Sequence, residues 1–383
     1  RFIVACKADS EYIAEDIREA KKNRDERLAK EQEFEKSIVD LNCLSLDFEE
    51  MRILYSLENL IVSNDISITK NKNDADLKEK WQRKWQEKLI TILSSDNITL
   101  ENFFLNEKEI QKYLGTNSNE MAQYLIVLEA MLFEPYYAIF EDDNDKKLKQ
   151  LKNKSKYLLE NYTHLQDLIS AKEIEKIKKV YRKSLSKIAG ADKGMIIGAI
   201  GTAAVMIASA ALAFTFAPVI AVALVGNGAA GLSGAALISH CLAVLGGGTL
   251  AAGGLGMAGG TAVITGGGAL LGMVSGTGMS AATVYLLSQE GYVLSECSRL
   301  LTYCKVVLKE RLHDEKSIID IYTKLESQID TIKNSITEFE RNLQSEDKKE
   351  QKENKKKIKV AKNSLKYLES CLSELQKLVK DSK

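Results

Sequence analysis

The feature that most restricts what this chain can fold into is a run of 96 residues, 194–289, without a single Lys, Arg, Asp or Glu. Charged residues make up 28% of the whole chain, so this block differs chemically from both of its flanks. A helical crossing of a bilayer takes about 20 apolar residues, and the block is therefore long enough for up to four crossings, or for two with additional interfacial segments. We expect it to lie in a lipid bilayer in at least one state of the protein.

The block is also rich in glycine, since 21 of the 24 glycines lie between Gly194 and Gly278. In its second half small residues recur at steps of four, and on a helix such positions form a groove that lets another helix approach closely, which favours oligomerisation. Glycine also weakens a helix by up to about 1 kcal/mol relative to alanine, so the block can stay folded against the protein until it is triggered. The predicted insertion and packing residues are Gly248, Ala252, Gly256, Gly260, Gly268, Gly272, Gly276 and Pro218.

Two segments of the block, 226–231 and 254–259, match the glycine pattern of dinucleotide-binding loops. That fold also needs an acidic residue about 20 positions downstream for the ribose, and none occurs before Glu290. The three histidines are dispersed along the chain, and no nucleophile or carboxylate constellation with a plausible pocket is visible. We therefore expect no cofactor, no metal site and no enzymatic activity.

Basic residues gather on both sides of the block. Residues 172–193 hold eight basic side chains against three acidic ones, and residues 299–311 hold four against one. This distribution fits an even number of crossings, with both flanks on the cytosolic face of an anionic bilayer, although an ordinary solvated helix face gives the same pattern. The predicted membrane-surface residues are Lys178, Lys179, Arg182, Lys183, Lys187 and Lys193.

The flanks contain almost no glycine or proline, which predicts an all-α fold. Residues 11–60 are expected to form one or two helices, followed by a polar loop over 63–76. Trp81 and Trp85 then lie on one helical face, where core packing is the natural role for them. Residues 121–133 are strongly apolar but too few to cross a bilayer, so they predict the buried central helix of this part.

The segments on either side of the block predict longer helices. Apolar residues between Leu148 and Ile169 recur at steps of three, four or seven, which predicts one helix from Lys146 to about Ala189. Towards the C-terminus two series step alternately by three and four, separated by the polar tract 344–357, and predict an antiparallel coiled-coil hairpin rather than a straight rod. The predicted seam includes Leu325, Ile329, Ile332, Ile336, Leu365, Leu368 and Leu372.

The predicted organisation is thus a long helical bundle and an antiparallel coiled-coil hairpin that flank a glycine-rich hydrophobic membrane block. Its parts are an N-terminal helical domain (1–145), a long connecting helix (146–193), the block (194–289) and C-terminal helices that include the hairpin (290–383). Basic and acidic residues number 53 each, so the charge balance gives no reason to expect nucleic-acid binding. The six cysteines show no paired spacing and are expected to be reduced thiols of a cytosolic protein.

In layout alone, long helices followed by a glycine-rich apolar insert and then coiled-coil helices, the chain resembles the α-helical pore-forming toxins of the cytolysin A and haemolysin BL type. Its insert is longer than a simple hairpin requires and no secretion signal is visible, which makes it more similar to membrane-disrupting effectors of bacterial defence or toxin systems. The resemblance implies a pore-forming or membrane-disrupting effector or toxin of the cytoplasm or the membrane, with an anionic bilayer as its target and a homo- or hetero-oligomer as its assembly. A different class remains open: a constitutive integral membrane scaffold whose coiled-coil hairpin recruits partners.

Overall fold

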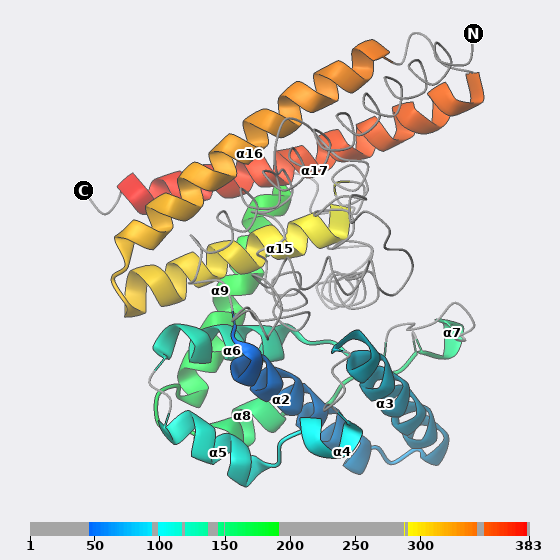
Figure 1. The fold of residues 1–383 in the computed structure, drawn as a ribbon, viewed down its shortest axis with the longest axis vertical. Coiled ribbons are helices and arrows are strands. Elements are labelled where there is room, and N and C mark those ends of the chain that lie inside the picture. The colour runs from blue at the N-terminus through cyan, green and yellow to red at the C-terminus, as the bar shows by residue number, and fades with distance from the viewer. Residues whose placement is uncertain are drawn as a thin grey trace, which may run out of the picture.

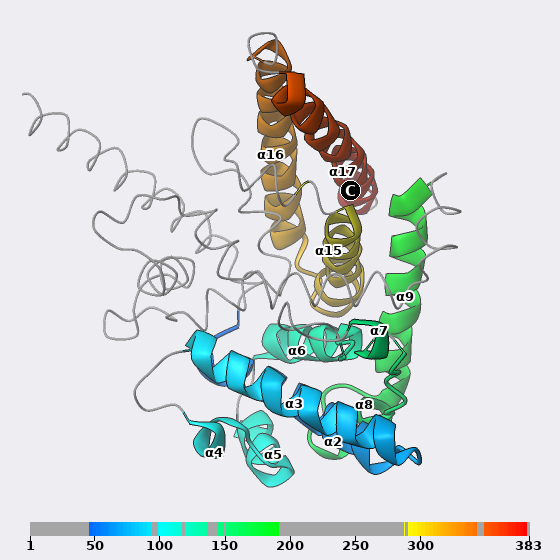
Figure 2. The same cartoon turned by 90° about the vertical axis from the view of Figure 1, so that its right-hand side faces the viewer.

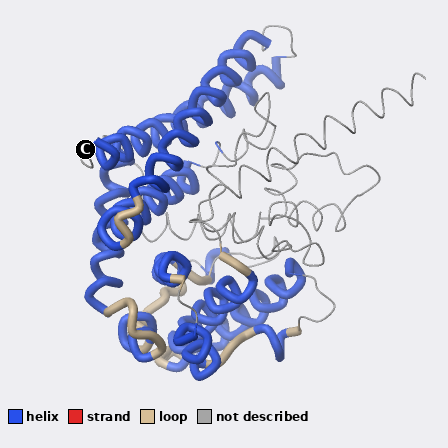
Figure 3. The backbone as a smooth tube through the Cα atoms, turned by 60° about the vertical axis from the view of Figure 1, so that its left-hand side comes forward, coloured by secondary structure: helices blue, strands red, loops and turns tan. Residues whose placement is uncertain are grey.

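A computed structural model describes the parts of the chain outside most of the apolar block, and in these parts every regular element is a helix (Figure 3). The helices form two layers, with the N-terminal helices α2 to α8 in one and the C-terminal helices in the other (Figure 1). Within these residues no helix combines the length and apolar character that a bilayer crossing needs. The described residues are 46–93, 99–116, 119–136, 145–148, 150–190, 287, 290–342 and 348–380.

The N-terminal layer begins with a helix whose start is fixed by its own sequence. Asp47 accepts a hydrogen bond from the Glu50 backbone N–H at 2.8 Å, and Glu50 accepts one from the Asp47 N–H, also at 2.8 Å. This reciprocal cap satisfies two N–H groups that the first helical turn cannot pair internally. The helices of the layer are α2 (Phe48–Ser67), α3 (Lys72–Leu93), α4 (Leu100–Phe103), α5 (Glu107–Thr116), α6 (Glu120–Leu132), α7 (Asp145–Leu148), α8 (Tyr157–Glu160) and the 3₁₀ helix η2 (Tyr162–His164).

The two tryptophans lie on α3, and the prediction that they pack in the core is confirmed. Both side chains are buried, and their rings stack with centroids 6.0 Å apart. The polar loop before them is shorter than the predicted 63–76, because α2 continues to Ser67 and α3 begins at Lys72. Asn71 explains the early start of α3, since its side-chain oxygen accepts hydrogen bonds from the N–H groups of residues 73 and 74.

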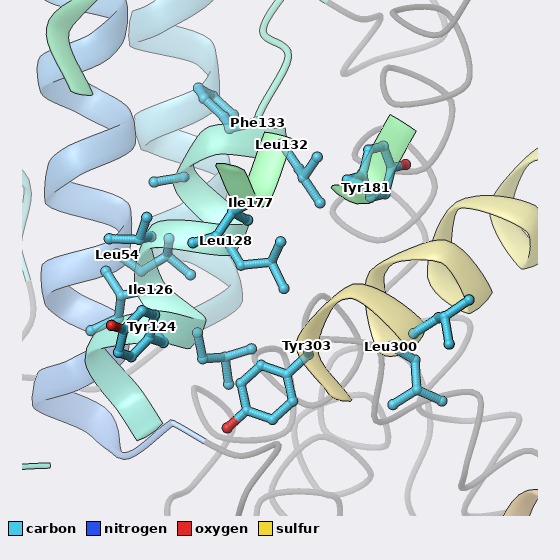
Figure 4. Packing of buried hydrophobic residues seen from close by; sticks show 14 of the residues in the cluster. Leu54, Tyr124, Ile126, Leu128, Leu132, Phe133, Ile177, Tyr181, Leu300 and Tyr303 are labelled. Atoms are coloured by element: carbon cyan, nitrogen blue, oxygen red, sulfur yellow. The ribbon is translucent and has the colours of Figure 1, made fainter. Parts of the chain in front are cut away.

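The apolar run 121–133 forms α6, the most completely buried helix of the N-terminal layer, as predicted. α6 packs on α2 and also contacts α9 and, in the C-terminal layer, α15. Figure 4 shows Leu128 and Leu132 of α6 between Leu54 of α2 and Leu300 of α15. A helix in this position must be apolar all round, which explains why its sequence lacks a clear polar face.

The long connecting helix predicted over 146–193 is wrong for most of its length. Only Ala171–Ala189 is a continuous helix, α9, and the residues before it run through short turns and loops. Side chains distant in sequence hold these loops, because the Lys154 N–H donates to Asp65 Oδ1 at 2.6 Å and Ser155 Oγ donates to Asn64 Oδ1 at 2.8 Å. The periodic apolar residues that predicted a helix are nevertheless buried or half-buried. Their spacing therefore identified which residues are buried, but it did not identify the path of the backbone.

The C-terminal layer consists of three helices and a π-helical segment, joined to the N-terminal layer through α9. The ion pairs Lys333–Glu369 (2.8 Å) and Lys362–Glu340 (2.7 Å) link the two longest helices. Lys333 precedes Glu340 in the first of these helices, whereas their partners occur in the reverse order in the second, where Lys362 precedes Glu369. The two helices therefore lie side by side and run antiparallel (Figures 1 and 2). The elements are α15 (Glu290–Tyr303), the π-helix η5 (Cys304–Arg311), α16 (Glu315–Asn342) and α17 (Lys348–Lys380).

The predicted seam residues of α16 and α17 are all buried or half-buried. Leu325, Ile329, Ile332, Ile336 and Leu368 are buried, whereas Leu365 and Leu372 are half-buried. A second face of α17 is also buried, because α17 packs on α15 as well as on α16. The heptad pattern predicted only the first of these two faces.

A buried carboxylate fixes the geometry of the N-terminal layer. Asp65 of α2 receives hydrogen bonds from the Lys78 ammonium, from Tyr136 Oη at 2.5 Å and from the Lys154 N–H. Lys78 also donates to Thr69 Oγ1 and to the Lys152 carbonyl, each at 3.0 Å. The charge of each partner is therefore neutralised inside the protein, and α2, α3 and the loop before α8 are tied together.

We predict that Asp65→Ala destabilises the protein by about 3–5 kcal/mol, because the mutation leaves the buried Lys78 ammonium without its counter-charge. Urea unfolding followed by tryptophan fluorescence measures this, since both tryptophans lie in the same layer. Asp76→Ala, at an exposed position of α3, is the matched control and should change stability by no more than about 0.5 kcal/mol. Equal losses in the two variants would contradict the assigned role of Asp65.

Candidate functional site at the base of the apolar block

The helix that precedes the apolar block and Leu287, near the end of the block, both bind to the same helix, α17. The block follows α9, where Lys187 Nζ donates to Glu374 Oε2 of α17 at 2.9 Å. At its other end the Leu287 carbonyl accepts a hydrogen bond from Ser364 Oγ of α17 at 2.6 Å. At 1.5 Å per residue, the two attachment points lie about 15 Å apart along α17. We call α9, α15 and α17 the base of the block.

The helices of the base contact one another directly. Ile174, Ile177, Tyr181 and Ile188 form one buried face of α9, and this face packs on α15. Within the contact, Tyr181 Oη and Ser295 Oγ are 2.9 Å apart and hydrogen-bonded. The start of α9 is set by Ser170, whose Oγ accepts from the Glu173 N–H.

The opposite face of α9 is lined by lysines. Lys172, Lys176, Lys179, Lys183 and Lys187 follow one another at steps of four, three, four and four, which places them in one line on the helix. All five are exposed, and we call this set the lysine stripe. The other predicted membrane-surface residues of α9, Lys178 and Arg182, are exposed beside the stripe, whereas Lys193 lies outside the described residues.

The Glu374 carboxylate forms ion pairs with three lysines near the end of the stripe. Glu374 pairs with Lys187 at 2.9 Å, with Lys305 at 3.5 Å and with Lys377 at 2.5 Å. Partial burial acts to raise the pKa of Glu374, but the hydrogen bonds and charges of these lysines outweigh it and lower the pKa to about 2. The group keeps an excess of positive charge, because one carboxylate faces three ammonium groups.

A second charged group lies buried between the two layers. Arg299 Nη1 of α15 is 3.0 Å from Glu129 Oε2 of α6 and 3.0 Å from Glu296 Oε1 of its own helix. Glu58 of α2 is also buried there, and its charge interacts with those of Glu129 and Arg299. We call Glu58, Glu129, Glu296 and Arg299 the Arg299 cluster. It contains three carboxyl groups but one cation.

This imbalance changes the protonation of the cluster. Burial raises the pKa of Glu129 from its ordinary value of 4.5 to about 8, against the opposing effect of the Arg299 charge and with a further rise from Glu296. Burial and the nearby charge of Glu129 also raise the pKa of Glu58 well above its ordinary value. Near neutral pH the cluster is therefore partly protonated, which reduces the cost of enclosing three acidic groups together.

Two local features of the sequence indicate the members of this cluster, but not their contact. Glu129 is the only charged residue within the otherwise uncharged run 121–133, and a charge in a fully buried helix needs a partner. Glu296 and Arg299 stand three residues apart on α15, the spacing of neighbours on a helix. Nothing in the sequence indicated that these two elements meet.

The glycine groove and Pro218 lie outside the described residues, so the predicted packing role of that set stays a prediction. In the described part of the chain, His, Cys, Asp and Glu side chains form no group that could hold a metal ion. Comparison of the chain with protein-family models, with curated proteins and with solved structures finds no match.

We predict that the stability of the protein falls as the pH rises from about 4.5 to about 8, because the folded protein keeps a proton on Glu129 that the unfolded chain releases. One group changes the free energy of unfolding by at most about 1.4 kcal/mol per pH unit. Glu129→Gln keeps the shape of the side chain and removes this titration, so the free energy of unfolding of the variant should decrease less steeply with pH. Urea unfolding over a pH series measures the effect. Glu101→Gln, at an exposed position of α4, should retain the slope of the unaltered protein.

Proposed function

We propose that the protein is a membrane-inserting, pore-forming or membrane-disrupting effector that acts through residues 194–289. The observation that carries the proposal is the absence of charge over 96 residues, which follow a helix that binds α17 and end near Leu287, which binds α17 as well. A chain that leaves and returns on the same side of a bilayer crosses it an even number of times. The length of the block suits two or four helical crossings.

The composition of the block supports conditional rather than permanent insertion. Its glycines lower the stability of each isolated helix, while the groove of small residues gives helices a surface for close packing once they lie in lipid. Such packing also favours oligomers, which a pore requires. The helical flanks then act as the part of the protein that holds the block before insertion.

We also infer that α16 and α17 form an antiparallel coiled-coil hairpin. The buried seam residues and the ion pairs Lys333–Glu369 and Lys362–Glu340 support this geometry. The hairpin is also the element that the alternative function requires, since a constitutive membrane scaffold would recruit its partners through this hairpin. In the effector that we favour, α17 serves mainly to hold the two ends of the block.

Dye release from liposomes tests the proposed function. The full chain is compared with a variant in which residues 194–289 are replaced by a flexible Gly/Ser linker long enough to join the two ends across the base. We predict that only the full chain releases dye, because only it contains the apolar segments that can cross the bilayer. Circular dichroism of the variant checks that the helical flanks remain folded.

The outcomes separate the two classes of function. Release by the full chain alone supports the effector. A full chain that needs detergent for extraction from membranes, yet releases no dye, overturns it in favour of the scaffold. Equal release by both proteins also overturns it, because the permeabilising activity then lies in the flanks.

We predict in addition that Gly268→Leu, Gly272→Leu and Gly276→Leu together reduce dye release to the level of liposomes alone, because leucine fills the groove that lets helices pack closely. The triple change to alanine is the matched control, since alanine remains small enough for close packing, and it should retain most of the release. Full release by the leucine variant would exclude the groove from the mechanism.

A further inference from the structure

We propose that the lysine stripe of α9 docks the protein on the headgroups of an anionic bilayer, beside the helix from which the chain continues towards the block. The inference rests on the proposed function, because it names the surface that the same protein recognises before insertion. It concerns the described helix α9, and its test measures binding separately from permeabilisation.

The first support is the geometry of the stripe. Its line lies opposite the buried face of α9, which packs on α15, and all five lysines are exposed, although Lys176 and Lys187 also reach Glu310 and Glu374 of neighbouring helices. Over the 15 residues from Lys172 to Lys187 the stripe is about 22 Å long. The two acidic residues of α9 lie off this line, and one of them, Glu173, is engaged with Ser170 and Tyr124. The residues of α9 that form the stripe are therefore all basic.

The second support is that most of this charge is not neutralised within the described part of the protein. Lys172, Lys179 and Lys183 have no ion pair there. Lys176 pairs with Glu310, but both side chains are about half exposed, and exposed pairs contribute little. Lys187 shares Glu374 with two other lysines. An external anionic surface can therefore attract the stripe without first breaking a strong internal ion pair.

The third support is the position of α9. Figure 2 shows α9 at the rim of the molecule, with the other described helices to one side of it. The helix ends at Ala189, shortly before the block begins, and its last turns touch α17, which also holds Leu287. A bilayer that lies along the stripe is therefore adjacent to the end of α9, from which the chain continues towards the block. Duplex nucleic acid carries a similar charge but offers no apolar phase for that block.

Vesicle flotation with the full chain tests the docking surface. The stripe variant carries Lys172→Gln, Lys179→Gln and Lys183→Gln, which remove three charges that have no internal partner. The charge control carries Lys80→Gln, Lys108→Gln and Lys112→Gln, at exposed positions of α3 and α5, and changes the net charge equally. The probes are vesicles of phosphatidylcholine alone, vesicles of phosphatidylcholine with phosphatidylserine, and duplex DNA.

We expect the stripe variant to bind the phosphatidylserine vesicles about 100-fold more weakly than the unaltered chain, from the usual contribution of a basic residue near an anionic surface. The control variant should bind nearly as well as the unaltered chain, and added salt should weaken the binding of both. Equal losses in the two variants, undiminished binding by the stripe variant, or stronger binding to DNA than to the anionic vesicles would each overturn the proposal. Binding that depends on the stripe without any dye release supports docking and overturns the proposed permeabilising function instead.

Discussion

The contact of α15 with α9 and α6 is the constraint on which the rest of the described structure depends. At this contact Arg299 reaches Glu129 of the N-terminal layer, while Tyr181 of α9 bonds Ser295 of α15. The two halves of the chain, separated by the apolar block, therefore share one continuous core in the described residues. Because the flanks are joined in this way, the block begins and ends on a single folded body and not on two independent ones.

The charges of this body are distributed in two opposite ways. Acidic groups exceed basic ones inside the contact, where burial raises the pKa of Glu58 and Glu129 and keeps the cluster partly protonated. Basic groups dominate outside, where the lysine stripe and the lysines around Glu374 surround the end of α9. The inner group, on α2, α6 and α15, joins the two layers, and the outer group gives α9 a positively charged surface. Both arrangements converge on the helices that carry the block.

Several features could be predicted because a local pattern determines them. The paired tryptophans of α3, the buried helix α6 and the buried seam of α16 each follow from the spacing or run length of apolar residues. The segment before α9 could not be predicted in the same way. Its apolar residues are spaced like those of a helix, but Asp65 and Asn64 of α2 bind its polar groups and hold it as a loop. Spacing reports which residues are buried, whereas the backbone path depends on partners about 90 residues away.

The sequence by itself determined that the described parts of the protein are helical, that the block carries no charge and that the residues before it are basic. These properties follow from composition and from patterns that span a few turns. Only the tertiary structure decided that α9 and Leu287 both bind α17, that one arginine pairs with carboxyl groups of two layers and that the lysine stripe is exposed. Each of these depends on contacts between segments more than 70 residues apart, and such contacts are set by how whole helices pack and not by any local pattern.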